Sequence, residues 1–288
     1  MLTSFRFEQG PRMSGAAVPL RPRSLLVLSV ASLAGLMMLV WPLLLRVPEG
    51  ARVDPPFFFL ALLPLVIVVV LAEFSEGGMD ARVLAILGVL SAINAVLRAV
   101  SAGVAGVEFV FFLLILAGRV FGPGFGFALG CTSLFASALM TAGVGPWLPF
   151  QMLASAWVGM GAGLLPRRAT GRAEIAMLVA YGIFAAYAFG ILMNLSGWPF
   201  LLGVEIPGVA APEGGLSYVA GDPMLENLRR FGVYTLLTST GSWDTGRAIT
   251  NSVALMVLGP AVLHTLRRAS RRVVIVALDA PAESGHRS

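Results

Sequence analysis

The chain has 288 residues, of which 57% are hydrophobic and only 12% are charged, and its mean hydropathy of +0.86 is far from that of a water-soluble domain. All twenty basic residues are arginine, which excludes P-loop NTPases, Schiff-base enzymes and protein kinases, because each of these needs a lysine. The single cysteine excludes paired-cysteine chemistry, and the formal charge of +5 comes from arginines beside apolar stretches, not from a basic stripe suited to nucleic acid.

Eight apolar stretches predict an all-α integral membrane protein with about eight transmembrane helices. A helix needs roughly 20 mainly apolar residues to cross about 30 Å of hydrocarbon. In chain order the candidate spans are residues 24–45, 56–72, 83–100, 104–120, 125–141, 147–165, 175–195 and 248–266. The first follows arginines as a signal peptide would, but its apolar run is too long and precedes a poor cleavage site, so we interpret it as a span.

Clusters of arginine predict the orientation of these spans. Basic residues are in excess in cytoplasmic loops. With an even number of spans, three clusters fall on one side: Arg6, Arg12, Arg21 and Arg23; Arg167, Arg168 and Arg172; and Arg267, Arg268, Arg271 and Arg272. We therefore expect a multi-pass protein of the cell membrane with both termini cytoplasmic, and with the connections at residues 143–147 and 196–247 facing outward.

Polar side chains of the third and fourth spans are expected to meet near the outer surface. Asn94 and Arg98 are four residues apart and so share one helix face. Glu108 enters the fourth span from the same side, which predicts a pair between Arg98 and Glu108 across the short turn. A charged side chain in a bilayer needs a partner or a water-filled cavity, so a structural pair and a ligand contact are both consistent with the sequence.

Polar residues also share one helix face in the sixth span and at the start of the last span. Gln151 follows Trp147 by one turn, and Asp244, Arg247 and Asn251 recur on one face beside Trp243. Aromatic surface with a few oriented polar groups is what a pocket for an organic ligand needs. The candidate substrate-binding residues are Asn94, Arg98, Glu108, Trp147, Phe150, Gln151, Asn194, Trp243, Asp244, Arg247 and Asn251. Several of these residues also have a structural alternative. Trp147 would lie at the membrane interface, Gln151 would hydrogen-bond only to a neighbouring helix, and Arg247 would extend to the membrane surface.

Small residues predict close contacts between helices. Ala81, Ala85, Gly88 and Ala92 recur along the third span at spacings of three to four. Small side chains let helix backbones approach in a bilayer, so this face suits either packing inside the bundle or docking of a separate membrane subunit. The glycine-rich segments of the fifth and sixth spans predict tight contacts within the bundle.

No motif for catalysis or metal binding emerges. An HExxH motif is absent, the only histidines are His264 and His286, and no serine has a convincing histidine partner at depth. The segment EGGMDARV at residues 76–83 is similar to the acidic signature of lipid-head-group phosphotransferases, but it lacks the further aspartates that would hold metal ions. We therefore expect no enzyme, no metal and no cofactor.

Three segments resemble the substrate-binding S components of energy-coupling factor (ECF) vitamin transporters. They are LAILGVLSAINAVLRA at residues 84–99, the run of residues 118–166, and TSTGSWDTGRAITNSVALMVLGPAVLHTLRR at residues 238–268. Within the second, GPWLPFQM corresponds to a GPW-x-P-(W/F)-QM pattern of some branches, and the third looks like the last core helix of actinobacterial members. The resemblance covers about residues 81–268, which is six of the eight spans.

The resemblance implies how the chain is organised. It implies a six-helix core at residues 81–268 with a long outer loop at 196–247, preceded by a cytoplasmic tail at 1–23 and an additional hairpin at 24–73, and followed by a cytoplasmic tail at 269–288. We expect residues 223–237 of the long loop to form an amphipathic helix across the mouth of the site.

The resemblance also implies function and partners. A vitamin or related micronutrient binds near the outer face and is released inward when the whole bundle reorients. The partners are a membrane T component and two cytosolic ATPases, with the T component meeting the face of Ala81, Ala85, Gly88 and Ala92. Branches of the family with a segment similar to GPWLPFQM favour cobalamin, a related tetrapyrrole or a nucleoside-like vitamin as the substrate.

Two other classes of function are consistent with the residues. An intramembrane enzyme acting on a lipid-linked substrate would lose turnover when Asp244, Glu108 or Arg247 is changed. A structural or assembly protein without a ligand would respond to Trp147→Ala in its stability alone. Genes for a T component and an ATPase pair beside this one would separate both classes from an importer.

Overall fold

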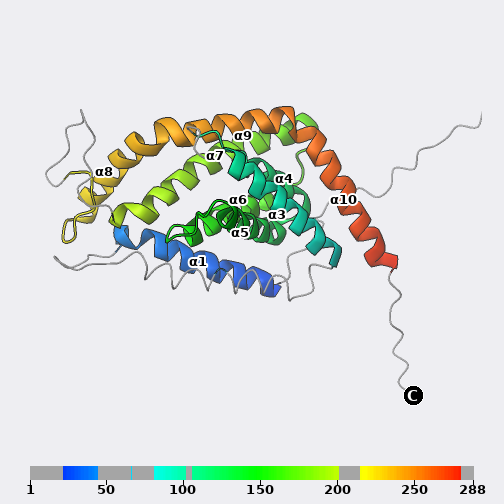
Figure 1. Cartoon of the computed structure of the whole chain (residues 1–288), viewed down its shortest axis with the longest axis horizontal. Coiled ribbons are helices and arrows are strands. Elements are labelled where there is room, and N and C mark those ends of the chain that lie inside the picture. Colours follow the sequence, from blue (N-terminus) through cyan, green and yellow to red (C-terminus); the bar gives the residue numbers. More distant parts are fainter. Residues whose placement is uncertain (1–21, 45–65, 67–80, 102–105, 201–214, 280–288) are drawn as a thin grey trace, which may run out of the picture.

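The computed structural model describes residues 22–44, 66, 81–101, 106–200 and 215–279, and within these ranges the chain is helical and contains no strand. The prediction of an all-α membrane protein is thereby confirmed. In Figure 1, α7 and α9 run together along one edge of the bundle, α1 lies along the opposite edge, and α5 and α6 lie between them. The helices are α1 (Pro22–Leu44), α3 (Ala81–Ser101), α4 (Val110–Phe121), α5 (Pro123–Met140), α6 (Leu148–Leu164), α7 (Gly171–Gly197), η1 (Trp198–Phe200), α8 (Met224–Thr235), η2 (Leu236–Asp244), α9 (Thr245–Val257) and α10 (Gly259–Asp279).

Four described helical segments are long and apolar enough to cross a membrane: Pro22–Trp41, Ala81–Ser101, Pro123–Met140 and Gly171–Phe200. They confirm the first, third, fifth and seventh predicted spans. The second predicted span, at residues 56–72, lies outside the described residues apart from Val66.

The fourth and sixth predicted spans are shorter than expected. At 12 residues, α4 is about 18 Å long, too short to cross about 30 Å of hydrocarbon alone, and α6 has 17 residues. All twelve residues of α4 are buried, so this helix forms the interior of the bundle instead of facing lipid.

The predicted bounds of the last span, residues 248–266, are wrong. The segment Met224–Val257 is one continuous helix made of α8, η2 and α9, and it is bent by 66° from Gly259–Arg271. Pro260 accounts for the break, because its ring clashes with the preceding turn and it has no backbone N–H to donate to residue 256. Residues 224–247 therefore lengthen this helix instead of forming a loop. The helix expected at residues 223–237 is confirmed as α8, which is the first part of the continuous helix; its place across the mouth of the site remains a prediction.

Glycines bring α5 and α6 into backbone contact, as their composition predicted. A β-carbon on Gly159 would overlap the backbone of Gly126, and one on Gly130 would overlap the backbone of Ala156. Close backbone approach replaces the hydrophobic effect as a source of adhesion between helices in a bilayer. These two helices therefore form a rigid centre against which the others pack.

The Gly159→Ala variant is expected to lower the free energy of unfolding by about 1–3 kcal/mol, because the backbone atoms facing Gly159 cannot move aside as a flexible side chain would. SDS-induced unfolding in mixed micelles measures this loss. Gly88→Ala on α3 is the matched control, because nothing lies within 4 Å of a β-carbon at that position. Equal stability of both variants and the wild type would contradict the tight packing of α5 on α6.

A buried ion-pair cluster ties α4, α7 and α10 together at one end of the bundle. We call Arg119, Glu174 and Arg267 the basal cluster. The Nε of Arg119 lies 2.8 Å from Oε1 of Glu174, and Nη2 of Arg267 lies 2.6 Å and 2.8 Å from the two oxygens of the same carboxylate. Arg119 also donates to the carbonyls of Leu165 and Ala169, on either side of Arg167 and Arg168, so two of the three predicted arginine clusters share one end of the molecule. That this end is cytoplasmic remains a prediction.

Candidate functional site

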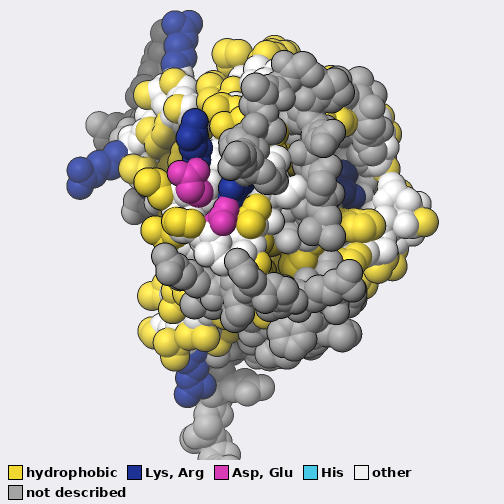
Figure 2. All heavy atoms as spheres, turned by 90° about the vertical axis from the view of Figure 1, so that its left-hand side faces the viewer, with side chains coloured by type: hydrophobic (Ala, Val, Ile, Leu, Met, Phe, Trp, Pro, Cys, Tyr) yellow, Lys and Arg dark blue, Asp and Glu magenta, His cyan; other side chains and the backbone are white. Residues whose placement is uncertain are grey.

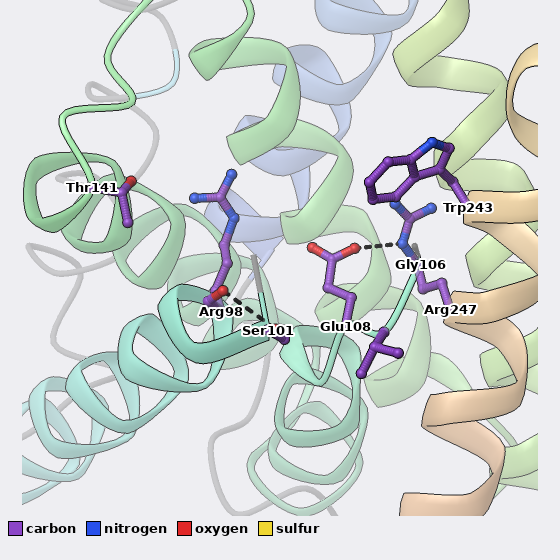
Figure 3. A pocket seen from close by; sticks show the side chains of 8 residues that line it. Arg98, Ser101, Gly106, Glu108, Thr141, Trp243 and Arg247 are labelled. Carbon is purple, nitrogen blue, oxygen red and sulfur yellow. Dashed lines mark hydrogen bonds and ion pairs between the residues drawn. The ribbon is translucent and has the colours of Figure 1, made fainter. Parts of the chain in front are cut away.

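A cavity of about 270 Å³ lies between α3, the start of α4 and the junction of η2 with α9. Figure 3 shows Arg98 on one side of it, and Glu108, Trp243 and Arg247 on the other. Three separate parts of the chain thus bring charged and aromatic groups to one hollow. Its lining residues are Arg98, Ser101, Gly106, Val107, Glu108, Thr141, Trp243 and Arg247.

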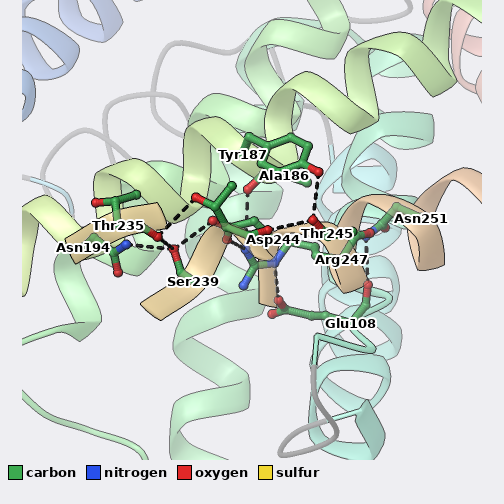
Figure 4. Close-up of polar contacts among 11 residues, drawn as sticks. Glu108, Ala186, Tyr187, Asn194, Thr235, Ser239, Asp244, Thr245, Arg247 and Asn251 are labelled. Atoms are coloured by element: carbon green, nitrogen blue, oxygen red, sulfur yellow. Dashed lines mark hydrogen bonds and ion pairs between the residues drawn. The ribbon is translucent and has the colours of Figure 1, made fainter. Parts of the chain in front are cut away.

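Arg247 is the centre of the charged network beside the cavity (Figure 4). Its Nε lies 2.6 Å from Oε2 of Glu108, and its Nη1 lies 3.0 Å from Oδ1 of Asp244. The guanidinium also lies over the rings of Phe111 and Phe189, at 5.5 Å and 4.8 Å from their centroids. We call Glu108, Asp244 and Arg247 the cavity cluster. The alternative in which Arg247 reaches to the membrane surface is wrong, because its side chain is turned inward and buried.

Asp244 is held from behind by a second line of polar groups. Its side chain is 1% exposed, and its Oδ2 accepts a hydrogen bond of 2.9 Å from the hydroxyl of Ser239. Asn194 donates to the same hydroxyl at 2.7 Å. A side chain at Gly190 would overlap the Asp244 carboxylate, so this glycine of α7 provides the space in which the carboxylate lies.

Asn251 fixes the backbone that carries Glu108. Its Nδ2 donates to the carbonyl of Glu108 at 2.8 Å, across 143 residues of sequence. Gly106, just before Glu108, has φ of +80°, and a β-carbon there would overlap the carbonyl oxygen of Trp243. Glycine is needed at this position both for its backbone conformation and for the close approach of η2.

On the opposite wall, Arg98 belongs to a polar ladder between α3 and α5. Its Nη1 donates to Ser137 Oγ and its Nη2 to Gln151 Oε1, each at 3.0 Å. One turn earlier, Asn94 donates to Ser133 Oγ at 3.0 Å. The ladder sets the position of the Arg98 guanidinium at the cavity.

Several predicted contacts differ from those observed. The predicted pair between Arg98 and Glu108 is wrong: Glu108 binds Arg247, and Arg98 binds Ser137 and Gln151. The pairing changes because α9 brings Arg247 closer to Glu108 than the turn after α3 brings Arg98.

Trp147 and Phe150 do not line the cavity. Trp147 is 51% exposed, and its indole folds over Gly145 to donate to the carbonyl of Gly143 at 3.3 Å. Phe150 is buried in the apolar core. The predicted site residues with an amide side chain, and Asp244, do not line the cavity either. Gln151, Asp244 and Asn251 hydrogen-bond to lining residues, whereas Asn94 and Asn194 hydrogen-bond to Ser133 and Ser239.

Sequence reasoning missed the hydroxyl groups that complete the site. Ser133 and Ser137 are four residues apart on α5, the same spacing as Asn94 and Arg98 on α3, so matching spacings on neighbouring helices were the available signal. Ser239, in η2, carried no such pattern.

The charges of the site are mostly hidden from the surface. Figure 2 views the end of the molecule at which α8 lies; there acidic side chains adjoin arginines in one place, and other arginines lie separately around the edge of the view. Asp244 and Arg247 are both buried, so they act on the cavity and not on the exterior. Within the described ranges, no three His, Cys, Asp or Glu side chains gather as a metal ion would require.

Comparison with known proteins gives one match. The family model described as ECF transporter, substrate-specific component matches residues 82–278, which include every lining residue of the cavity. No curated protein and no solved structure matches the chain.

Proposed function

Because the chain belongs to the family of ECF transporter substrate-specific components, we propose that the cavity beside Arg98, Glu108 and Trp243 is the site at which it captures its substrate. Members of this family are transporter subunits that bind small substrates and work with a T component and ATPases, which supports a role in transport. The observation that supports the site is the convergence of three matched parts of the chain on one hollow with charged and aromatic walls.

The size of the cavity favours a small micronutrient. Pockets for drug-sized ligands measure about 300–1,000 Å³, and this cavity, at about 270 Å³, lies just below that range. A tetrapyrrole such as cobalamin is larger than this space. Of the substrates that the sequence suggested, a compact vitamin or nucleoside-like molecule is therefore the one we propose.

We also propose that α3 provides the docking face for the T component. Ala81, Ala85, Gly88 and Ala92 are all exposed on this helix, and a side chain added at Gly88 would meet nothing within 4 Å. Small exposed residues permit close contact with another membrane helix. The Gly88→Leu variant, co-expressed with a T component and the two ATPases, should fold but fail to co-purify with them; retention of the complex would place the docking face elsewhere.

The capture site is tested by purification of the full chain in mild detergent, identification of co-purified small molecules by mass spectrometry, and titration of the ligand so identified. We expect Trp243→Ala to weaken its binding about tenfold or more, through loss of ring contact at the cavity. Trp147→Ala is the matched comparison, because this tryptophan has similar exposure but lies outside the cavity. Weakening by Trp147→Ala alone would contradict the site.

A further inference from the structure

The Arg98 wall of the cavity carries a positive charge that contacts no carboxylate among the described residues, although Glu108 attracts it from across the cavity. A guanidinium has five N–H donors. Two are used, on Ser137 and Gln151, and both of these partners are neutral. The remaining donors suit a planar carboxylate, which an arginine binds with two parallel hydrogen bonds.

The opposite wall has an excess of negative charge. Arg247 is shared between two carboxylates, Glu108 and Asp244, so this cluster has a formal charge of −1. Its contact with Glu108 uses Oε2, and no described residue donates to Oε1. A cationic N–H donor in the cavity would bind this free oxygen.

The two walls together exclude ligands of one charge. A simple anion that binds Arg98 is repelled by the excess negative charge of the cavity cluster, and a simple cation drawn to Glu108 is repelled by Arg98. The half-exposed ring of Trp243 adds a flat apolar surface beside Glu108, and the volume of about 270 Å³ limits the ligand to a few functional groups.

We infer that the substrate is a compact, planar zwitterion, whose acidic group binds Arg98 and whose cationic N–H group binds Oε1 of Glu108. This assignment rests on the proposed function of the cavity and names the chemical class of its substrate. Trp243 contacts the ring that joins the two groups.

Three probes of matched shape test the assignment by titration calorimetry on the full-length protein in detergent. They are 3-(aminomethyl)benzoate, a zwitterion; 3-ethylbenzoate, the corresponding anion; and 3-(aminomethyl)benzamide, the corresponding cation. We expect the zwitterion to bind at least tenfold more tightly than either of the others, because each lacks one charge-assisted hydrogen bond. Tightest binding of the anion or the cation, or binding of none of the three, would overturn the inference.

Variants assign each half of the ligand to its wall. Arg98→Gln should weaken binding of the zwitterion at least tenfold while leaving the cation unaffected or bound more tightly, and Glu108→Gln should show the reverse preference. Arg229→Gln and Glu226→Gln on α8 are matched controls that lie outside the cavity. Because Glu108→Gln also weakens the contact with Arg247, size-exclusion chromatography verifies that this variant folds. Arg98 forms no ion pair among the described residues, so Arg98→Gln tests the zwitterion even where Glu108→Gln does not fold.

The chemistry of the native ligand distinguishes failure of the zwitterion assignment from failure of the proposed capture site. The molecule that co-purifies should contain both an acidic and a basic group, as mass spectrometry and its electrophoretic mobility at pH 7 would show. A co-purified ligand that needs Trp243 but lacks one of these groups would refute the zwitterion and leave the capture site intact. Absence of any ligand dependent on the cavity would refute the proposed function itself.

Discussion

Replacement of Arg247 by alanine is expected to remove ligand binding and to lower the free energy of unfolding by about 3–5 kcal/mol. The guanidinium is the cation for both Glu108 and Asp244, and Asp244 is 1% exposed. Without Arg247, this carboxylate is left charged and buried without a cationic partner. SDS-induced unfolding in mixed micelles, together with titration of the co-purified ligand, measures both losses.

Two further variants separate charge from geometry at this position. Arg247→Lys keeps the charge but cannot contact both carboxylates with one planar group, so we expect it to recover part of the stability and little of the affinity. Asp244→Asn added to Arg247→Ala removes the more deeply buried of the two unpaired charges and should recover part of the stability but not the affinity. Arg229→Ala, at an exposed arginine of α8, controls for the loss of a positive charge. Wild-type stability and affinity of Arg247→Ala would refute the role of the cavity cluster.

At the basal cluster, Glu174→Ala is expected to cost about 3–5 kcal/mol of unfolding free energy, because the guanidinium of Arg119 then stays buried without its carboxylate. The side chains of Arg119 and Glu174 are each 3% exposed, so water does not replace the lost partner. Ligand affinity per folded molecule should be unchanged, since neither residue lines the cavity. Unfolding in mixed micelles and ligand titration on the folded fraction check both statements.

Arg267→Ala is the matched control for that variant. Its side chain is 44% exposed, and its removal leaves the pair between Arg119 and Glu174 in place, so the expected loss is at most about 1 kcal/mol. The double variant Arg119→Ala with Glu174→Ala should be more stable than Glu174→Ala alone, because it buries no unpaired charge. Equal losses from Glu174→Ala and Arg267→Ala would contradict the burial of this pair.

Apolar length and helical periodicity were enough to predict much of the fold. Continuous apolar runs predicted α1, α3, α5 and α7 to within a few residues at each end, because the hydrocarbon thickness sets their length. The same criterion failed for α4, whose twelve residues are covered on all sides by other helices. Apolar composition alone does not distinguish a helix buried in protein from one that faces lipid.

Sequence patterns singled out four of the eight residues that line the cavity, which are Arg98, Glu108, Trp243 and Arg247, but fewer of their contacts. Periodicity correctly grouped Asp244 with Arg247, since residues three apart lie on one face. It did not predict that Arg247 instead of Arg98 binds Glu108, because that choice depends on how far apart α3, α4 and α9 lie. Trp147 lies outside the cavity for a local reason, because its indole turns back over Gly145 and away from the face of Gln151.

Polar contacts at both ends of the bundle join the same three segments, which are α4, α7 and the bent pair of α9 and α10. Glu108 lies just before α4 and Arg119 lies in its last turn, while Arg247 and Arg267 lie on either side of the bend between α9 and α10. On α7, Glu174 contacts one cluster, and the Ala186 carbonyl lies 3.5 Å from Nη1 of Arg247 in the other. If one of these segments slid lengthwise by a single turn, about 5.4 Å, ion pairs at opposite extremities would separate at once. This arrangement therefore joins the three segments at both ends and resists the sliding of one segment past another.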